Sequence, residues 1–548
     1  MSRPHPAAGA TELPGHRDHG PTASPTGDQE RVSRTGILRR TILAITALWV
    51  AVMLVWSVLL PTYRSPDEVG HVSNSYALLE NGEWPGYQEL ELLTWVVQAR
   101  PPEHAGYQAL TTDTTDLAPS FADLREQNLG SPWSGEISTT GQHPPGYHAL
   151  LAGALAVLPA DVPAHVTVWW LRLGNVALLA PLPLLLALGA RRLRAPPAAV
   201  VAAAAFPLLI PQLGTLGAAV SNDNLMILTA TAATILAVHA ATGDMRRRIA
   251  VGAGVVLAAA LFTKAFALLL VPLIGLAYLL GGWRAGALTQ AVRRLGLIAA
   301  LAATTGWWWV ANLFRYGTVQ PAGHYPPRPE GPLDPLQTLP DFLLEIAIRV
   351  PGRFFSSLAI QIGQQPPPFP YWMTTGLFAL LLLLAVVVLV RTASFGMRRA
   401  DTALLLLPFA ASFAAMISGV WPLHLQTGLM VGLQGRYLYT GLAGLVLVVV
   451  LGVAAMLPRR ARWAVPGVIL AGGGLYTLLS MRKVAGFHWA ERDSALGDAM
   501  EALQAWAPAP DAVLWLIALA AAGAAVWVVA STVTTARRDL AAAAPVRA

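Results

Sequence analysis

The chain has 548 residues, of which 55% are hydrophobic and 12% charged, with a formal net charge of +7 and no cysteine. Its many apolar runs of about twenty residues match the roughly 30 Å of hydrocarbon in a bilayer, so the sequence predicts a polytopic membrane protein. Lys and Arg collect in the cytoplasmic loops of such proteins, so the positive charge does not indicate nucleic-acid binding, and the lack of Cys excludes disulfides, thiol catalysis and thiolate metal sites.

The first forty residues are rich in Pro, Gly, Ser, Thr and charged residues and show no apolar period. We therefore expect residues 1–40 to be a disordered cytoplasmic tail. An all-α membrane domain should follow over residues 41–536, and residues 537–548 should form a second cytoplasmic tail. Apolar runs predict about twelve transmembrane helices, within a range of eleven to thirteen, at 41–61, 165–190, 196–218, 224–242, 249–263, 265–282, 295–314, 373–391, 401–420, 438–457, 463–481 and 512–534.

Clusters of arginine set the orientation of these helices. From residues 39–40 to residues 537–538, every cluster falls on one side of the membrane under this count, and the positive-inside rule assigns that side to the cytoplasm. The apolar run 143–159 is too short to cross comfortably, and counting it as a span would move the arginines at 191–194 to the other side. We interpret it as an interfacial or re-entrant helix.

Two long segments, 62–164 and 315–372, then lie on the extracytoplasmic side. The first loop is acidic and contains Trp, Tyr and Pro, so we expect it to fold as short helices on the membrane surface. The predicted spans 249–263 and 265–282 meet at Lys264. This spacing predicts a tight helical hairpin with its tip near the outer face.

The motif SPDEVGH follows the first span directly. Ser65 is a favourable N-cap, proline is favourable at the first helical position, and Glu68 would complete a capping box. Such a box requires neither Asp67 nor His71, which lies four residues later on the same helix face. Two carboxylates beside the membrane suit a general base or a bound cation, and these residues alone leave both interpretations open.

Polar residues in two other motifs have simpler explanations. His143 in HPPGY stands where a proline pair permits a helix to start, although its ring could also form a hydrogen bond or bind a metal. In SNDN, Ser221 or Asn222 can cap the next span, and Asp223 is then an acid of the first turn, favoured by the helix dipole. Both patterns are more typical of helix starts than of a site.

Two cations near the outer face are less easily explained. Lys264 interrupts a long apolar run, where a charge usually marks function or has a specific partner; the alternative is that its side chain extends to the interface. Arg436, followed by Tyr437 in QGRY, stands at the outer entrance of a span. Its planar guanidinium suits the two oxygens of a phosphate, and the positive-inside bias makes an external arginine unusual.

The motifs SPDEVGH, HPPGY, SNDN, TK and QGRY, in this order, resemble the GT-C superfamily of membrane glycosyltransferases, and most closely the bacterial DUF2142 membrane proteins. The resemblance covers residue 41 to at least residue 440. It implies a helical membrane fold whose first external loop carries the catalytic carboxylate near the outer leaflet. It also implies a polyprenyl-phosphate sugar as donor and an envelope glycan, lipid or protein as acceptor.

The same resemblance suggests a role for each candidate residue. Asp67 would take a proton from the acceptor hydroxyl in an inverting reaction, with Glu68 orienting it or sharing a divalent cation, and His71 would belong to the same catalytic site. Lys264, Arg436 and Tyr437 would bind the donor phosphate, and His143, Asn222 and Asp223 would position the substrate. Whether a metal takes part is left open.

Two other classes of protein remain alternatives. A transporter or flippase for lipid-linked glycans would need polar residues along a path near the middle of the bilayer, where the sequence offers little besides Lys264. A non-catalytic assembly protein of a glycan pathway would use the acidic pair only as a helix cap. The exchange of Asp67 for Asn keeps the helix start and removes the base, so it separates this last alternative from the enzyme.

Overall fold

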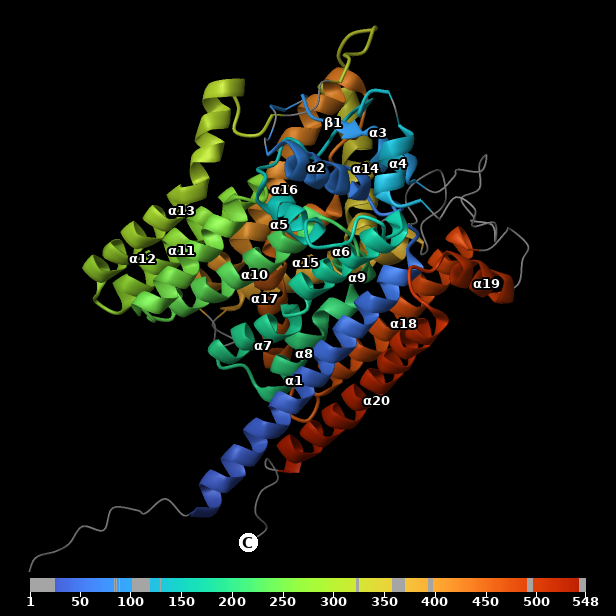
Figure 1. Cartoon of the computed structure of the whole chain (residues 1–548). Coiled ribbons are helices and arrows are strands. Elements are labelled where there is room, and N and C mark those ends of the chain that lie inside the picture. The colour runs from blue at the N-terminus through green and yellow to red at the C-terminus, as the bar shows by residue number, and fades with distance from the viewer. Residues whose placement is uncertain are drawn as a thin grey trace, which may run out of the picture.

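The structure, a computed structural model, describes residues 25–541 except for 83, 85, 88, 101–118, 129, 322–324, 357–369, 393–397 and 490–495. It is a bundle of long helices with short helices and a small sheet gathered over one end (Figure 1). The first half contains α1 (Pro25–Leu59), α2 (Glu68–Asn81), β1 (Glu91–Leu93), α3 (Thr94–Gln98), α4 (Phe121–Gln127), β2 (Trp133–Ile137), α5 (Gly146–Leu155), α6 (Ala164–Leu179), α7 (Leu182–Arg192), α8 (Pro197–Ala205), the 3-10 helix η2 (Phe206–Leu209), α9 (Pro211–Gly217) and α10 (Asn222–Ala241).

The second half continues the bundle and returns to the first helix, so that α20 lies along α1 (Figure 1). It contains α11 (Arg247–Leu261), the 3-10 helix η3 (Ala265–Leu269), α12 (Leu270–Arg284), α13 (Leu288–Tyr316), α14 (Pro335–Phe355), α15 (Tyr371–Val390), α16 (Arg399–Thr427), the 3-10 helix η6 (Gly435–Gly441), α17 (Leu442–Met456), α18 (Ala464–His488), α19 (Leu496–Trp506) and α20 (Asp511–Ala541).

The protein is a multi-pass helical membrane protein. Within the described residues, ten helices are long and apolar enough to cross a membrane, or eleven if one bent pair is counted. Every predicted span coincides with helix. The count is lower than the expected twelve because α11 has only 15 residues, fewer than the roughly 20 that a perpendicular span needs.

The bent pair occupies the predicted span 196–218. Its two parts, Pro197–Leu209 and Pro211–Gly217, meet at an angle of 72°. Pro207 and Pro211 flank the break, and each lacks the backbone N–H that a continuous helix would use. The chain therefore bends where the sequence predicted one straight helix.

Helix α1 also begins earlier than expected. It starts at Pro25, inside the segment 1–40 that was expected to be a disordered tail. Proline is tolerated in the first turn of a helix, and no further proline occurs before the apolar run, so nothing interrupts the helix upstream of the membrane. Residues 1–24 and 542–548 of the two expected tails lie outside the described residues.

The first loop, between α1 and α6, folds into a cap over one end of the bundle (Figure 1). It contains the expected short helices α2 to α5, and α5 has 10 residues, too few to cross a membrane. The loop also contains a two-stranded antiparallel sheet of β1 and β2, which the sequence analysis did not predict. Residue Ser73 of α2 supports this sheet because its hydroxyl accepts a hydrogen bond from the backbone of Leu93.

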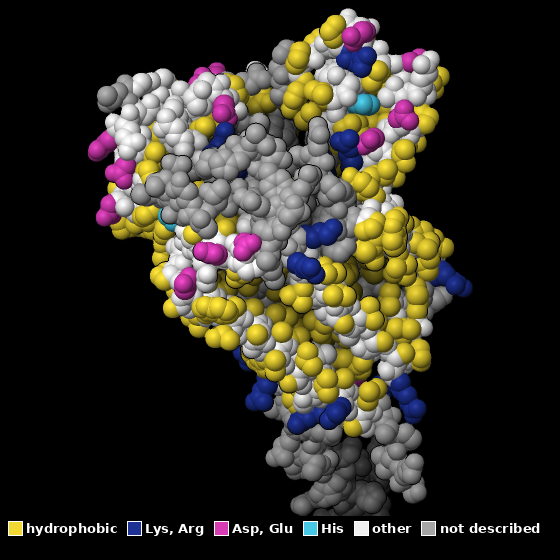
Figure 2. All heavy atoms as spheres, turned by 90° about the vertical axis from the view of Figure 1, so that its right-hand side faces the viewer, with side chains coloured by type: hydrophobic (Ala, Val, Ile, Leu, Met, Phe, Trp, Pro, Cys, Tyr) yellow, Lys and Arg dark blue, Asp and Glu magenta, His cyan; other side chains and the backbone are white. Residues whose placement is uncertain are grey.

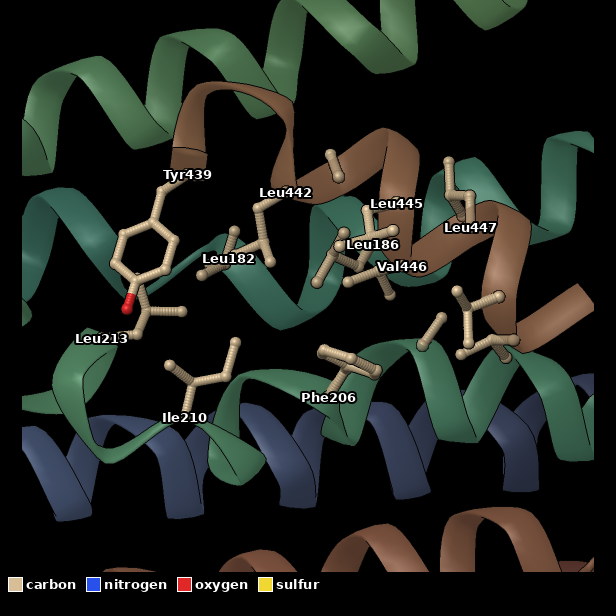
Figure 3. Packing of buried hydrophobic residues seen from close by; sticks show 14 of the residues in the cluster. Leu182, Leu186, Phe206, Ile210, Leu213, Tyr439, Leu442, Leu445, Val446 and Leu447 are labelled. Carbon is tan, nitrogen blue, oxygen red and sulfur yellow. The ribbon is translucent and has the colours of Figure 1, made fainter. Parts of the chain in front are cut away.

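Helix α17 forms the centre of the bundle. Of the most apolar stretch of η6 and α17, 83% is buried within the protein. The same share is only 6% for α20, which lies at the periphery. Figure 3 shows side chains of η6 and α17 packed against α7 and the bent pair. At Gly444, an added Cβ would lie 1.8 Å from the backbone oxygen of Leu405 in α16, so only glycine allows these helices to approach this closely. Peripheral helices instead present apolar side chains outward, and Figure 2 shows this belt with Lys and Arg along its lower edge.

Candidate active site

A cavity of about 890 Å³ opens where the first loop meets the ends of the central helices. The first and second loops, the turn before η3, α16 and η6 all contribute to its walls. Of the nine residues singled out in the sequence, six line it: Asp67, His143, Asn222, Lys264, Arg436 and Tyr437. The other three, Glu68, His71 and Asp223, lie behind this lining.

Asp67 reaches the cavity through an unusual backbone conformation. Helix α2 begins at Glu68, and Asp67 precedes it with φ of +62°, in the left-handed region, without a side-chain bond to the helix terminus. Aspartate tolerates this region better than most residues, although the conformation still costs free energy. The predicted capping box of Ser65 and Glu68 is therefore wrong: Asp67 is the residue before the helix, and its carboxylate is directed to another partner.

That partner is the first member of a chain of ion pairs across the wall of the cavity. The Asp67 Oδ2 atom accepts a hydrogen bond from Arg436 Nη2 at 2.6 Å, and Arg436 Nε lies 3.4 Å from Asp223 Oδ2. The other Asp223 oxygen accepts a hydrogen bond from Lys264 Nζ at 2.7 Å. Because the residue before α2, helices α10 and η6, and the turn before η3 each supply one of these charges, the chain of ion pairs joins four parts of the sequence.

Local packing holds the two cations in place. Lys264 stands in the break between α11 and η3, and its extended backbone ends the helical path there. The ring of Tyr437 lies 5.0 Å from its Nζ and 5.8 Å from the Arg436 guanidinium carbon, within the range of cation–π attraction. At Gly435 an added Cβ would lie 2.4 Å from the backbone nitrogen of Phe354, so η6 can lie against α14 only with glycine here.

Several buried polar atoms on this cavity have no hydrogen-bond partner among the described residues. They include Nη1 and Nε of Arg436, Nδ2 of Asn222 and Nδ1 of His143. A buried donor without a partner costs on the order of 1–3 kcal/mol. A polar ligand in this cavity would supply hydrogen-bond partners to all four of these atoms.

The histidines of the first loop form a cluster beside the cavity. His71 Nδ1 lies 3.1 Å from Nε2 of His148 in α5, so one ring donates and the other accepts. Burial lowers the pKa of His71 well below its ordinary value, and the nearby Lys264 ammonium lowers it further. Burial also lowers the pKa of His143 and of His148. All three rings are therefore neutral at pH 7, and His71 does not face the cavity.

Glu68 differs from its neighbour in its surroundings. Its side chain is fully buried and forms a two-bond ion pair with Arg172 of α6, at 2.8 and 2.7 Å. Its oxygens also accept hydrogen bonds from the backbone N–H groups of Tyr63 and Val220. The remaining Arg172 donors bond the backbone oxygens of Ser57, Leu60 and Pro61. Glu68 was expected beside Asp67 at the catalytic site. It does not line the cavity, because its side chain is buried in the ion pair with Arg172.

This arrangement also separates the two carboxylates that were considered as a cation site. Asp67 is paired with Arg436, and both oxygens of Glu68 are occupied on the far side of the helix start. Across the part of the chain that the structure describes, no group of three His, Asp or Glu side chains is placed to hold a metal ion.

Sequence reasoning missed three residues that organise the site. Arg172 fixes Glu68, His148 pairs with His71, and Asn175 Oδ1 accepts hydrogen bonds from Tyr147 and Asn224. Arg172 carried a usable signal, since it interrupts an apolar run just as Lys264 does. His148 and Asn175 carried no such signal in the sequence. Their hydrogen-bond partners lie close to them only because α2, α5 and α10 pack together.

Solved structures with a similar arrangement of helices include two kinds of enzyme. The first is ArnT from Cupriavidus metallidurans bound to undecaprenyl phosphate, with a TM-score of 0.43 and 13% identity, covering 90% of this chain and 76% of that one. The second is the oligosaccharyltransferase of Archaeoglobus fulgidus in its apo form, with a TM-score of 0.41 and 13% identity, covering 81% of this chain and 56% of that one. No curated protein matches the sequence.

A family model extends over most of the membrane region. It matches residues 50–445 and carries the description "Predicted membrane protein (DUF2142)". This segment is well over half of the chain and includes all nine residues singled out above, from Asp67 to Tyr437. The chain therefore belongs to the DUF2142 family of predicted membrane proteins.

Proposed function

We propose that this protein is an inverting glycosyltransferase, which moves a sugar from a polyprenyl-phosphate donor to a hydroxyl of a cell-envelope acceptor on the outer face of the cytoplasmic membrane. One observation carries the proposal. Arg436 is buried with unpaired donors, it lies beside Lys264, and the partly exposed carboxylate of Asp67 shares the same cavity.

The charges of the site suit a phosphate that arrives and leaves. Asp67 and Asp223 balance Arg436 and Lys264 while no anion is bound. A phosphate would use the unpaired Nη1 of Arg436 and compete with Asp67 for Nη2. The carboxylate, whose side chain is already 35% exposed, would then turn toward the acceptor. Phosphate binding and the release of the base are coupled in this arrangement.

The shape of the cavity favours a lipid-linked phosphate over a soluble one. Part of its lining is polar and carries the ion pairs, and another part is apolar and comes from α16, with Met416, Val420 and Leu423. An isoprenoid chain can lie along an apolar helix while its phosphate reaches the cations at the interface. ArnT from Cupriavidus metallidurans and AglB from Archaeoglobus fulgidus have been solved with undecaprenyl phosphate and with a dolichol-phosphate, respectively.

The proposed reaction is a single displacement. The acceptor oxygen forms a bond to the anomeric carbon while the bond from that carbon to the phosphate oxygen breaks, and the phosphate leaves with the electron pair. Asp67 takes the proton of the acceptor hydroxyl, as a general base worth roughly 10²- to 10⁴-fold in rate. Lys264 and Arg436 stabilise the charge that grows on the phosphate, each by on the order of a few kcal/mol.

The test is a transfer assay with the purified protein in lipid, supplied with labelled polyprenyl-phosphate sugars and envelope extracts. Wild type should move label to an acceptor, and Asp67→Asn should reduce the rate by at least about 100-fold. Glu126→Gln removes an exposed carboxylate of the same loop away from the cavity and should retain full activity. Equal transfer by wild type and Asp67→Asn would exclude Asp67 as the base. Donor binding without transfer by wild type would favour the transporter or assembly alternatives.

A further inference from the structure

A second polar cavity, of about 530 Å³, lies at the other end of the bundle. Its lining contains four arginines and one carboxylate: Arg192, Arg194, Arg284, Arg398 and Asp401. Because Asp401 offsets only one of the four arginines, the described lining keeps an excess of positive charge. None of these residues takes part in the proposed transfer reaction.

Two helices place this arginine pocket opposite the candidate active site. Helix α10 runs from Asp223 to the pocket residues around Thr242, and the span Ala265–Arg284 runs from Lys264 to the pocket. A helix of 20 residues is about 30 Å long. The pocket therefore lies one membrane thickness from the cavity, on the side that the arginine pattern of the sequence assigns to the cytoplasm.

The walls of the pocket are fixed by close packing and specific bonds. At Gly281 of α12, an added Cβ would lie 1.9 Å from the backbone oxygen of Ala240, so α10 and α12 touch directly beneath the pocket. Arg192 Nε donates to the hydroxyl of Thr242 at 2.9 Å, and Arg284 Nη1 donates to Asp401 at 2.5 Å. These bonds orient two guanidinium groups in the wall of the pocket.

An apolar groove of about 550 Å³ lies beside the pocket, between α12 and α16. The same two helices line both: Arg284 of the pocket follows Trp283 of the groove, and Asp401 of the pocket lies between Ala400 and Ala403 of the groove. Trp283 is 68% exposed, and tryptophan commonly lies at the level of lipid headgroups. The basic pocket and the apolar groove are therefore neighbours on the same two helices.

We propose that the pocket and groove together form a binding site for an anionic diacyl phospholipid. The arginines would hold its phosphate, and one acyl chain would lie in the groove along Leu276, Leu279 and Leu407. Basic pockets between membrane helices on the cytoplasmic side are suited to anionic headgroups. Free phosphate would satisfy the arginines but leave the groove empty, so charge and apolar surface together favour the lipid. This proposal does not depend on the transferase activity.

Native mass spectrometry of the full-length protein in detergent, titrated with dioleoyl phosphatidylglycerol, tests the site. Wild type should bind this lipid at least about tenfold more tightly than dioleoyl phosphatidylcholine. The double substitution Arg194→Gln with Arg398→Gln should weaken binding by about fivefold or more per charge removed. The matched control is Arg247→Gln with Arg248→Gln, two exposed arginines of the same face outside the pocket, and it should bind as wild type does.

The groove requires its own substitution, Ala403→Trp, which fills the groove without changing any charge. It should also weaken binding of the phosphatidylglycerol, and inorganic phosphate at millimolar concentration should not displace the lipid. Equal weakening by the pocket and control pairs would overturn the proposal in favour of general surface charge. Unchanged binding by Ala403→Trp, equal binding of phosphatidylcholine, or displacement by inorganic phosphate would each overturn it as well.

Discussion

Two adjacent carboxylates, Asp67 and Glu68, have opposite surroundings. Asp67 lies on the cavity with a partly exposed side chain, whereas Glu68 is fully buried against Arg172. Asp67 can therefore reach a bound molecule, whereas Glu68, the next residue, fixes the start of α2 through Arg172. The left-handed backbone at Asp67 makes this possible, because it turns the two side chains away from each other.

Glu68→Gln should therefore destabilise the protein far more than Asp67→Asn. Removing one charge of a buried pair leaves Arg172 uncompensated and should cost about 3–5 kcal/mol of folding free energy. Asp67→Asn keeps a similar shape at a partly exposed position and leaves Asp223 beside Arg436, so it should cost clearly less than Glu68→Gln. Thermal unfolding of both variants in the same detergent checks the difference. Similar unfolding temperatures for the two variants would show that Glu68 does not have the anchoring role described here.

The sequence indicated Asp67 and Glu68 as candidates but did not predict that one would line the cavity and the other would be buried. Asp67 and Glu68 were correctly placed at a helix start, and Ser221 was correctly predicted as a possible cap, since its hydroxyl accepts a hydrogen bond from Asp223 N–H. The capping box failed because its rule considers only neighbours within one turn. Arg172, 104 residues away, offers Glu68 a stronger partner than the helix terminus does.

At the scale of elements, α2 and α5 are joined through buried histidines. His71 and His148 meet between them, and His143 lies just before α5. Their neutral state is part of the packing, because burial disfavours a charge on each ring, and Lys264 disfavours it further on His71 and His143. The cap of the first loop should therefore respond to acid.

Stability should fall as the pH drops below about 6.5, the ordinary histidine value. The folded pKa values lie below this value, so the unfolded chain binds more protons in acid, and stability present at higher pH is lost on acidification. Each histidine contributes a slope of up to about 1.4 kcal/mol per pH unit. Unfolding temperatures measured from pH 7.5 to 5.0 should decline more steeply for wild type than for His148→Gln. Parallel curves would argue against a buried, neutral His148.

The long helices follow from the length of the apolar runs, whereas the bend inside one run and the strands of the first loop were not predicted. The prolines at 207 and 211 signalled a break that the hydropathy of the run concealed. The pairing of β1 with β2 joins segments about forty residues apart, and short strands of this kind have no distinct apolar pattern. Contacts across the first loop decide the pairing of these strands.

At the scale of the whole molecule, the account requires the two cavities to lie on opposite sides of the membrane. The chain has no cysteine, so single cysteines report sidedness without background. Glu126→Cys in the first loop should react with a membrane-impermeant maleimide added outside intact cells. Arg247→Cys, exposed at the other end of the bundle, should react only after the membrane is permeabilised. The reverse pattern would invert the proposed topology.

The candidate site joins residues that are far apart in the sequence. Residues up to 369 positions apart, Asp67 and Arg436, form one ion pair, and no local rule connects them. Their resemblance to a family pattern brought them together as candidates, and the packing of η6 against α14 and α10 supplies the physical reason. Arg172 and the arginine pocket, which belong to no such pattern, emerged only from the structure.

The central claim is that Asp67 and the donor phosphate compete for Arg436. The most direct test is the affinity of a polyprenyl phosphate for Asp67→Asn relative to wild type, measured in the same detergent. Removing the carboxylate charge frees the guanidinium, so binding should tighten by roughly tenfold, an effect typical of charge-assisted hydrogen bonds. Equal or weaker binding by Asp67→Asn would contradict the account, because the phosphate would then not occupy the place that the carboxylate holds.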